Sequence, residues 1–273
     1  MRVSQLNRNR KKRSQVDPIS GVLAFVATIF IAAPCLALVV KVPWSSFFSS
    51  ISQDGSVTAI KLTLWTSLTA AIACLIFGVP LGWWLSRGST RLTNIIRPIV
   101  LAPIALPPTV AGLALLALLA RRGIIGRWIY QSFSWQLPFT VYAVIFAGVF
   151  VGLPFVVLIT ESNFRHLPQE VEDAAVIDRA SNGQIFRLIA IPQAKSGIIT
   201  GIVLAWARVL GEFGATMMFA GSLPGTTQTW TMQIYQELDL NPDTAYALSV
   251  ALVVIAMTII IILRRPLREA FRA

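Results

Sequence analysis

Residues 170–192 read EVEDAAVIDRASNGQIFRLIAIP, and this charged segment lies between two long apolar stretches. Pro168 precedes it and suits the start of a short helix. Acidic side chains fall in the first turn of that helix, where the helix dipole favours negative charge: Glu170, Glu172 and Asp173. Because most connections between helices are only a few residues long, we expect this one to have a role of its own.

The second half of the segment predicts another short helix. Apolar residues recur at helical spacing in it: Ile185, Phe186 and Ile189. Ser181 or Asn182 can cap its start, and Pro192 is expected to end it. In the first helix, Ala174 and Ala175 offer a flat surface that another protein can approach closely. The segment therefore indicates a docking surface for a soluble partner, with an ordinary amphipathic connector as the alternative.

Composition indicates an all-α, polytopic membrane protein embedded in the lipid bilayer. Of 273 residues, 55% are hydrophobic and only 13% are charged, which is too apolar for a soluble domain of this size. The net charge of +11 fits basic residues that flank membrane spans on the cytoplasmic side. Binding of nucleic acid is therefore not expected.

Six segments have the roughly 20 apolar residues that a spanning helix needs: 19–41, 58–85, 96–119, 137–160, 196–220 and 244–263. Prolines inside them, including Pro107 and Pro108, are expected to be tolerated because neighbouring helices can satisfy the freed backbone groups. The first segment has spanning length without a clear cleavage site, which favours a retained helix over a signal peptide.

The expected domain division follows these segments. It comprises a cytoplasmic basic arm (1–18), a first transmembrane helix with an outer loop (19–57), the main transmembrane domain (58–263, with a cytoplasmic loop at 161–195) and a cytoplasmic basic tail (264–273).

Charge asymmetry predicts the orientation. With the N-terminus inside, 17 of the 23 basic residues lie on the cytoplasmic side and five lie outside, while Arg208 falls within a span. Such a bias predicts that both termini and the 161–195 loop are cytoplasmic.

Candidate metal ligands are sparse. Cys35 and Cys74 both lie in apolar runs, and the single histidine, His166, has no second ligand near it in sequence. We therefore expect no metal site, no catalytic site and no disulfide. A glycine-rich loop ending in Gly-Lys-Ser or Gly-Lys-Thr is also missing from the sequence, so the chain is expected to bind no ATP or other cofactor.

Arg208 and Glu212 are four residues apart and share one helix face. At 1.5 Å per residue, Arg208 lies about 20 Å beyond Lys195, near the middle of the membrane, where charges usually have a function. One interpretation is a structural ion pair. The other is that Arg208 supplies positive potential to an anion pathway, although a neighbouring carboxylate weakens that field.

Small and hydroxylated residues accompany this pair. Gly214 belongs to a small-residue face suited to tight packing or to a moving gate. Thr216, Thr227 and Thr229 are uncharged hydrogen-bonding groups that we include as candidate pathway residues. For the two later threonines, a solvated loop is an equally ordinary explanation.

The opening segment resembles the EAA motif of bacterial ABC importer permeases, in which Glu-Ala-Ala is followed at fixed spacing by Gly, Ile and Leu-Pro. Here Asp173 takes the place of Glu, Ile189 has the expected spacing, and Pro192 closes the motif. Arg179 stands where the family has glycine, at a turn that often needs positive φ. The resemblance implies a type I permease fold in which this loop docks on an ATPase subunit.

The Arg208–Tyr235 stretch resembles the molybdate permeases, which carry a similar Arg-x-Leu-Gly-Glu-Phe-Gly-Ala-Thr run followed by Phe-Ala-Gly, Pro-Gly and Thr-Gln-Thr. Residues 106–113 also look like theirs. Sulfate or thiosulfate permeases share only the core of this run and are the alternative. The resemblance therefore implies molybdate as cargo, with tungstate as a further candidate.

The same resemblance implies an assembly in the bacterial plasma (inner) membrane. It comprises a homodimer of this chain, two cytoplasmic ATPases that use ATP and Mg²⁺, and an extracytoplasmic oxyanion-binding protein. Three outer arginines either help to dock that protein or anchor the chain at the interface: Arg121, Arg122 and Arg127. An ion-coupled secondary transporter would instead need several charged mid-span positions or internal symmetry, and neither is evident.

Overall fold

The computed structural model describes residues 17–88 and 90–262, and every regular element in these ranges is helical. The expected basic tail and nearly all of the expected basic arm lie outside the described residues. The all-α prediction is confirmed.

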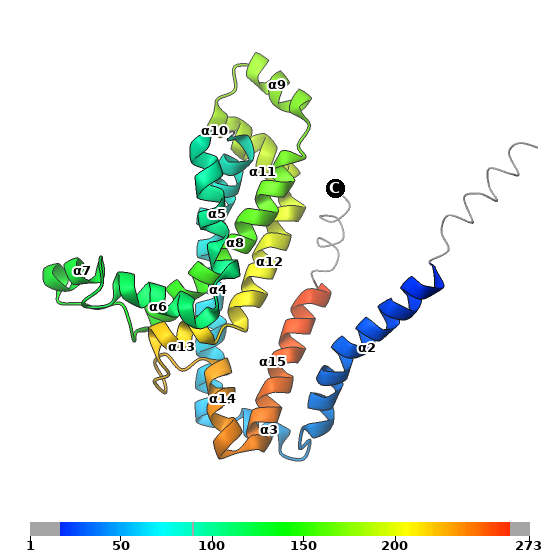
Figure 1. Cartoon of the computed structure of the whole chain (residues 1–273), viewed down its shortest axis with the longest axis vertical. Helices are drawn as coiled ribbons and strands as arrows, with labels where there is room; N and C mark the ends of the chain where they lie inside the picture. The colour runs from blue at the N-terminus through cyan, green and yellow to red at the C-terminus, as the bar shows by residue number, and fades with distance from the viewer. Residues whose placement is uncertain (1–16, 89, 263–273) are drawn as a thin grey trace, which may run out of the picture.

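Three helices form the centre of the molecule: α4 (Asp54–Arg87), α8 (Val141–Arg165) and α12 (Lys195–Leu210). They pack against one another along their length (Figure 1). Glycines allow the close approach of α4 and α8, because a Cβ added at Gly82 would lie 2.2 Å from the Thr160 hydroxyl. The Trp206 indole N–H of α12 donates to the Ser67 hydroxyl of α4 at 3.0 Å.

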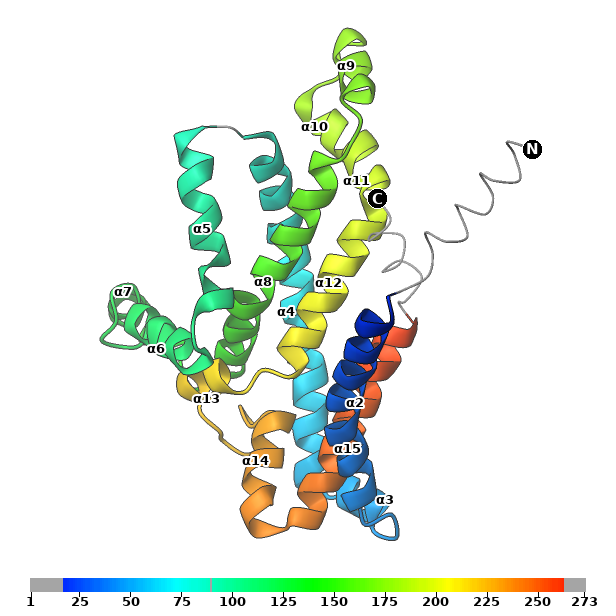
Figure 2. The same ribbon diagram turned by 45° about the vertical axis from the view of Figure 1, so that its right-hand side comes forward.

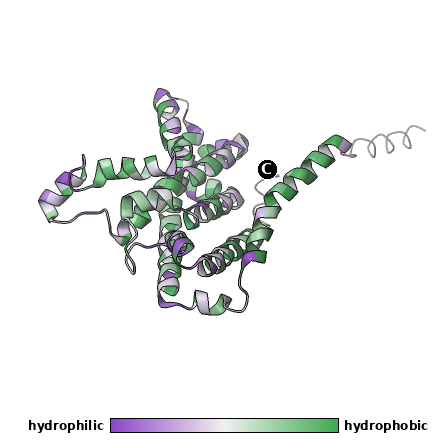
Figure 3. Ribbon diagram, turned by 60° about the horizontal axis from the view of Figure 1, so that its bottom comes forward, coloured by the Kyte–Doolittle hydropathy of each residue, from purple (hydrophilic) through white to green (hydrophobic). Residues whose placement is uncertain are grey.

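The first and last spans form a second group beside this centre. Helix α2 (Pro18–Lys41), capped by Asp17, packs on α15 (Pro242–Ile262), and the short α3 (Phe47–Ile51) links this group to α4 (Figure 2). Helix α2 has no buried residue, although it is apolar along almost its whole length (Figure 3). An apolar helix this exposed is suited to lipid or to another membrane segment.

The predicted 96–119 span is interrupted, which corrects our expectation for that segment. It forms α5 (Arg91–Ala105) and α6 (Pro108–Leu119), and α6 leaves the bundle sideways (Figure 1). The chain is extended at Leu106 and Pro107, with ψ of 135° and 137°. Two consecutive prolines remove two amide donors and disfavour helical ψ in the preceding residue, so the helix ends there.

The predicted 196–220 span is also interrupted. Helix α12 ends at Leu210, and after a short break α13 (Gly214–Ala220) packs against α6 and α8. A loop then leads to α14 (Trp230–Leu240), which packs on α4 and α15. Of the described helices, four are long and apolar enough to cross a membrane: α2, α4, α8 and α15. The bent pair 182–193 and 195–210 makes a fifth candidate span, at an angle of 76°.

Candidate functional site

The 170–192 segment forms one tip of the molecule, as Figures 1 and 2 show. Its first half is α9 (Gln169–Ile177), which begins directly after Pro168 and carries Glu170 and Glu172 in its first turn, as expected. Asp173 and Ala174 are exposed, and Ala175 is half-buried. The predicted first helix is therefore confirmed, with its acidic and alanine residues at the tip.

Arg179 closes α9 in the left-handed conformation, with φ of 60°. The Arg179 amide donates to the Val176 carbonyl at 3.0 Å and the Ala180 amide to the Ala175 carbonyl at 2.9 Å. This is the paired hydrogen bonding of a Schellman motif, which usually places glycine at this position. The turn is thus the one that the motif requires, formed here by a residue with a Cβ.

Ser181 is the residue that caps the second helix. Its hydroxyl accepts from the Gln184 amide at 3.3 Å, and the Gln184 side chain accepts from the Ser181 amide at 2.7 Å. This reciprocal arrangement is a capping box. It starts α10 (Asn182–Gln184), which continues as a π-helix, η1 (Ile185–Ala190), and as α11 (Ile191–Gln193).

Pro192 does not end this helix, which corrects our expectation. The helix continues to Gln193, and the bend into α12 follows at Ala194. Because Pro192 has no amide to donate to the fourth carbonyl before it, the turns that precede it widen into the π-helix. Ile189 is half-buried in that π-helix, while Pro192 is exposed.

An aromatic cluster joins this loop to the membrane helices. Trp83 of α4 packs edge-on against Phe164 of α8 and at a tilt against Phe186 of η1, with centroid separations of 5.2 and 5.6 Å. Arg87 lies over the Trp83 ring at 4.5 Å and forms an ion pair with Glu172 of α9. A cavity of about 450 Å³ lies beside this pair, lined by Trp83, Trp84, Arg87, Gly88, Glu172, Asp173, Val176, Asn182 and Ile185.

The loop also carries exposed apolar residues that we did not predict as functional from the sequence. Ile177 is 81% exposed and Leu188 is 71% exposed, and Val176 is also exposed. They lie at a polar tip rather than on a long apolar helix, which makes them candidates for contact with a protein partner. The sequence carries a signal for Leu188, which falls outside the apolar face of the second predicted helix, whereas Val176 and Ile177 lie in the first helix.

A charged network also fixes the end of α4. Buried Glu161 of α8 accepts from Arg97 of α5 and from Arg165, each at 2.8 Å. Both arginines donate to the Leu85 carbonyl, at 3.2 and 3.4 Å. Carbonyls in the last turn of a helix lack partners within the helix, so the two arginines satisfy the end of α4 and Glu161 offsets part of their charge.

Arg208 and Glu212 form the expected ion pair, at 2.5 Å. Buried Glu212 also accepts from the Ala215 amide at 2.8 Å, which caps α13, and its own carbonyl accepts from the Thr231 hydroxyl at 2.9 Å. The pair therefore holds the break between α12 and α13 and attaches it to α14. The Arg208 side chain remains 33% exposed.

The other candidate pathway residues lie close to this break. Gly214 and buried Thr216 belong to α13, and a Cβ at Gly214 would lie 2.6 Å from the Cβ of Pro108 in α6. Thr227 and Thr229 are buried. The Thr227 hydroxyl accepts from the Leu223 amide and donates to the Gly221 carbonyl, so the loop itself uses it. A role in anion passage stays a prediction for all four.

Residues 78–265 match the family described as "Binding-protein-dependent transport system inner membrane component". The chain belongs to this family. The match includes the loop at the tip, the Glu161 network and the Arg208–Glu212 pair of this inner membrane component.

Curated relatives of this inner membrane component cover most of its length. The molybdenum transport system permease protein ModB of Mycobacterium tuberculosis is 37% identical, over 87% of this chain and 90% of that protein. A putative molybdenum transport system permease protein of Bacillus subtilis, YvgM, is 34% identical, over 80% and 96%. The sulfate transport system permease protein CysT of Escherichia coli is 29% identical, over 88% and 87%.

Solved structures show the same fold at low sequence identity. A chain of a bacterial alginate ABC transporter, in complex with an alginate pentasaccharide-bound periplasmic protein, has a TM-score of 0.68 at 15% identity, covering 92% of this chain and 93% of that one. A chain of the inward-facing MetNI methionine ABC transporter has a TM-score of 0.61 at 17% identity, covering 78% and 95%. The inner membrane component therefore has the fold of an ABC transporter membrane subunit.

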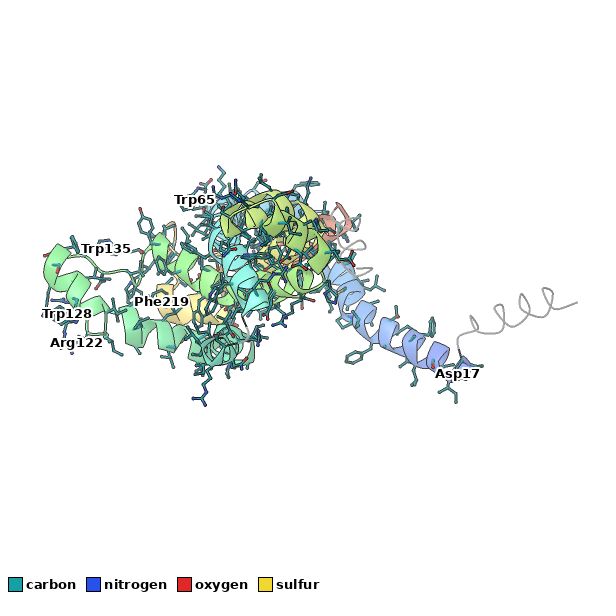
Figure 4. The ribbon with its side chains drawn as sticks, turned by 90° about the horizontal axis from the view of Figure 1, so that it is seen from above. Asp17, Trp65, Arg122, Trp128, Trp135 and Phe219 are labelled. Carbon is teal, nitrogen blue, oxygen red and sulfur yellow. The ribbon has the colours of Figure 1, made fainter. Side chains whose placement is uncertain are left out.

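The predicted outer arginines lie on a projecting arm formed by α6 and α7 (Gly126–Phe133). Figure 4 shows Arg122, Trp128 and Trp135 at its far end, away from the bundle. Arg121 lies 4.0 Å over the Tyr130 ring. Within residues 17–88 and 90–262, no group of three His, Cys, Asp or Glu side chains could hold a metal ion, and both cysteines are free.

Proposed function

We propose that this inner membrane component is the permease subunit of an ATP-driven importer that brings molybdate, and the similar tungstate anion, across the bacterial plasma membrane. The observation that carries the proposal is the loop at the tip. It combines the EAA spacing, the left-handed turn at Arg179 and exposed Ile177 in a chain 37% identical to a molybdenum permease.

The partner at the tip is a soluble ATPase, present in two copies. An exposed apolar surface at the end of a membrane protein favours a protein partner, and acids in the first turn of α9 suit a basic groove. ATP and Mg²⁺ belong to that partner, and this chain supplies no catalytic residue. Both chain termini and the 161–195 loop lie in the cytoplasm, in agreement with the distribution of basic residues.

The anion passes between two copies of this chain. Exposed apolar helices, α2 above all, leave ample surface for a second copy as well as for lipid. Arg208 lies in the last turn of α12 with a third of its side chain accessible, so it can meet an anion at the α12–α13 break. Glu212 offsets the positive charge of Arg208, so the site holds the anion weakly, which favours passage of the anion over its retention.

Transport then follows from rigid-body motion. ATP binding closes the two ATPases and brings the two tips together, and the helices attached to each tip move with it. The break between α12 and α13 is the place where a pathway can open, because the helix is interrupted there and polar contacts of Glu212 hold the interruption. An extracytoplasmic binding protein delivers the anion on the opposite side.

Sulfate is the second candidate cargo, because the Escherichia coli sulfate permease aligns over 88% of this chain. Its identity of 29% is lower than the 37% of the mycobacterial molybdenum permease. Both anions are tetrahedral and doubly charged, so the two cargoes differ mainly in size.

The test is association with the ATPase and the uptake that depends on it. We expect the purified chain to bind its ATPase partner and to support molybdate uptake in cells. Replacing Asp173 by Lys and Ala174 by Trp should abolish both, because a cation and a large ring then occupy the docking face. Uptake that survives this double substitution would contradict the proposed role of the loop.

A further inference from the structure

Both halves of the coupling loop, residues 161–195, meet the same end of α4. Glu172 of α9 forms an ion pair with Arg87, and Phe186 of η1 packs against Trp83. Arg87 and Trp83 are one helical turn apart on α4 and contact each other, since the guanidinium lies 4.5 Å from the centre of the Trp83 ring. One turn of α4 therefore holds two parts of the loop that are separate in sequence.

This turn of α4 is itself fixed to the rest of the bundle. Phe164 of α8 is fully buried against Trp83. The Leu85 carbonyl, between the two contact residues, accepts hydrogen bonds from Arg97 of α5 and Arg165 of α8. A displacement applied at Arg87 is therefore passed to α4, α5 and α8 together.

Helix α9 has little else to attach it. Among the described residues, the Arg87–Glu172 pair is the one hydrogen bond or ion pair of side chains that joins α9 to the membrane helices. The π-helix contacts α9 as well, but it belongs to the same loop. Without the pair, α9 would follow the membrane helices chiefly through its flanking chain and its contact with η1.

We propose that Arg87 and Glu172 are positioning residues that transmit the movement of α9 to α4, an inference that rests on the proposed function. Both side chains are partly exposed, and ion pairs of this kind contribute little to folding stability. Their loss should therefore uncouple the transporter rather than unfold it. The same contact makes α4, rather than α12 alone, a carrier of the ATPase movement.

The experiment uses the full complex in proteoliposomes, with the ATPase inside and the molybdate-loaded binding protein outside. Molybdate accumulated and ATP hydrolysed are measured together for wild type, Arg87→Gln, Glu172→Gln and the exchange Arg87→Glu with Glu172→Arg. We expect each single variant to assemble normally and to lower the molybdate moved per ATP by about threefold or more. The exchange should restore that ratio to within about twofold of wild type.

Arg91→Gln and Asp239→Asn are matched controls, because each removes one exposed charge outside the coupling loop without breaking an ion pair of the described residues. Both should keep the wild-type ratio. A normal ratio in the single variants, or no recovery in the exchange, would overturn the positioning role. If wild type itself shows no ATP-driven uptake, the proposed function fails instead, so the two failures are distinguishable.

Discussion

Arg179 keeps a turn that favours glycine. Its φ of 60° costs a residue with a Cβ about 1 kcal/mol or more, and the two Schellman hydrogen bonds offset this. The sequence shows that Arg179 replaces the glycine of the motif. It does not show whether the turn keeps its left-handed geometry with strain or adopts another geometry. The structure keeps the geometry, so the strain is local.

Arg179→Gly should relieve that strain. We expect slower amide hydrogen exchange at residues 178–181, consistent with about 1 kcal/mol of local stabilisation, and unchanged molybdate uptake. Arg179→Val should do the opposite, because a β-branched side chain is poorly accommodated at positive φ. Equal exchange rates in the two variants would show that the turn is not under strain.

Glu212 has both carboxylate oxygens occupied, one by Arg208 and one by the Ala215 amide. Glu212→Gln or Arg208→Gln alone should therefore lower stability by about 2 kcal/mol, since each leaves a charge unpaired and Arg208 is partly exposed.

The double variant Arg208→Gln with Glu212→Gln should recover thermal stability, because no charge is left unpaired, but should leave molybdate transport reduced, because the pathway then lacks the Arg208 guanidinium. Thermal unfolding in detergent and uptake in cells would measure the two effects. Recovery of both stability and transport would instead show that the pair is only structural.

At the scale of elements, helix positions were predictable from apolar length, whereas the two breaks were not. The Leu106–Pro108 run carried the signal for the first break. Proline alone does not decide the matter, because membrane helices often tolerate it, as α4 and α8 do at Pro80 and Pro154. The second break depends on contacts from α14 and α6, which a single sequence does not reveal. The Arg87–Glu172 pair joins residues 85 positions apart, so a single sequence does not predict this contact either.

The α4–α8 contact predicts a sharp response at Gly82. A methyl group there would overlap the Thr160 hydroxyl, so Gly82→Ala should destabilise the protein by about 1–3 kcal/mol. Adding Thr160→Ala should recover part of that loss, because it removes the overlapping oxygen. Thermal unfolding of the purified variants measures both. A double variant no more stable than Gly82→Ala would mean that the helices separate rather than clash.

The exposed apolar face of the coupling loop predicts a binding defect without a folding defect. Ile177→Lys should weaken association with the ATPase by about tenfold or more, as expected when a charge enters an apolar contact, and leave thermal unfolding unchanged.

Leu240→Lys is the control, since Leu240 is 79% exposed and ends α14, which lies at the end of the molecule opposite α9 (Figure 1). Equal weakening by both variants would point to a general effect of added charge rather than to docking at the loop.

At the scale of the whole molecule, the two ends have different chemistry. One end carries the acidic α9, which we propose docks on the ATPase, and the other carries the α14–α15 turn, with α6 and α7 projecting between them (Figure 1). The helical bundle joins the two ends through α4, which at 34 residues is the longest described helix. This arrangement suits a subunit that receives movement at one end and opens a pathway further along. Sequence similarity and structure establish the family and the fold, whereas uptake measurements test the cargo and the direction of transport.

The most direct test is uptake in proteoliposomes that contain only this chain, its ATPase and the external binding protein. We expect molybdate to accumulate only with ATP on the ATPase side and the binding protein on the other side, and we expect excess sulfate to inhibit this accumulation only weakly. Accumulation without ATP, or none with all three components present, would contradict the proposed role of this chain as the permease of an ATP-driven importer.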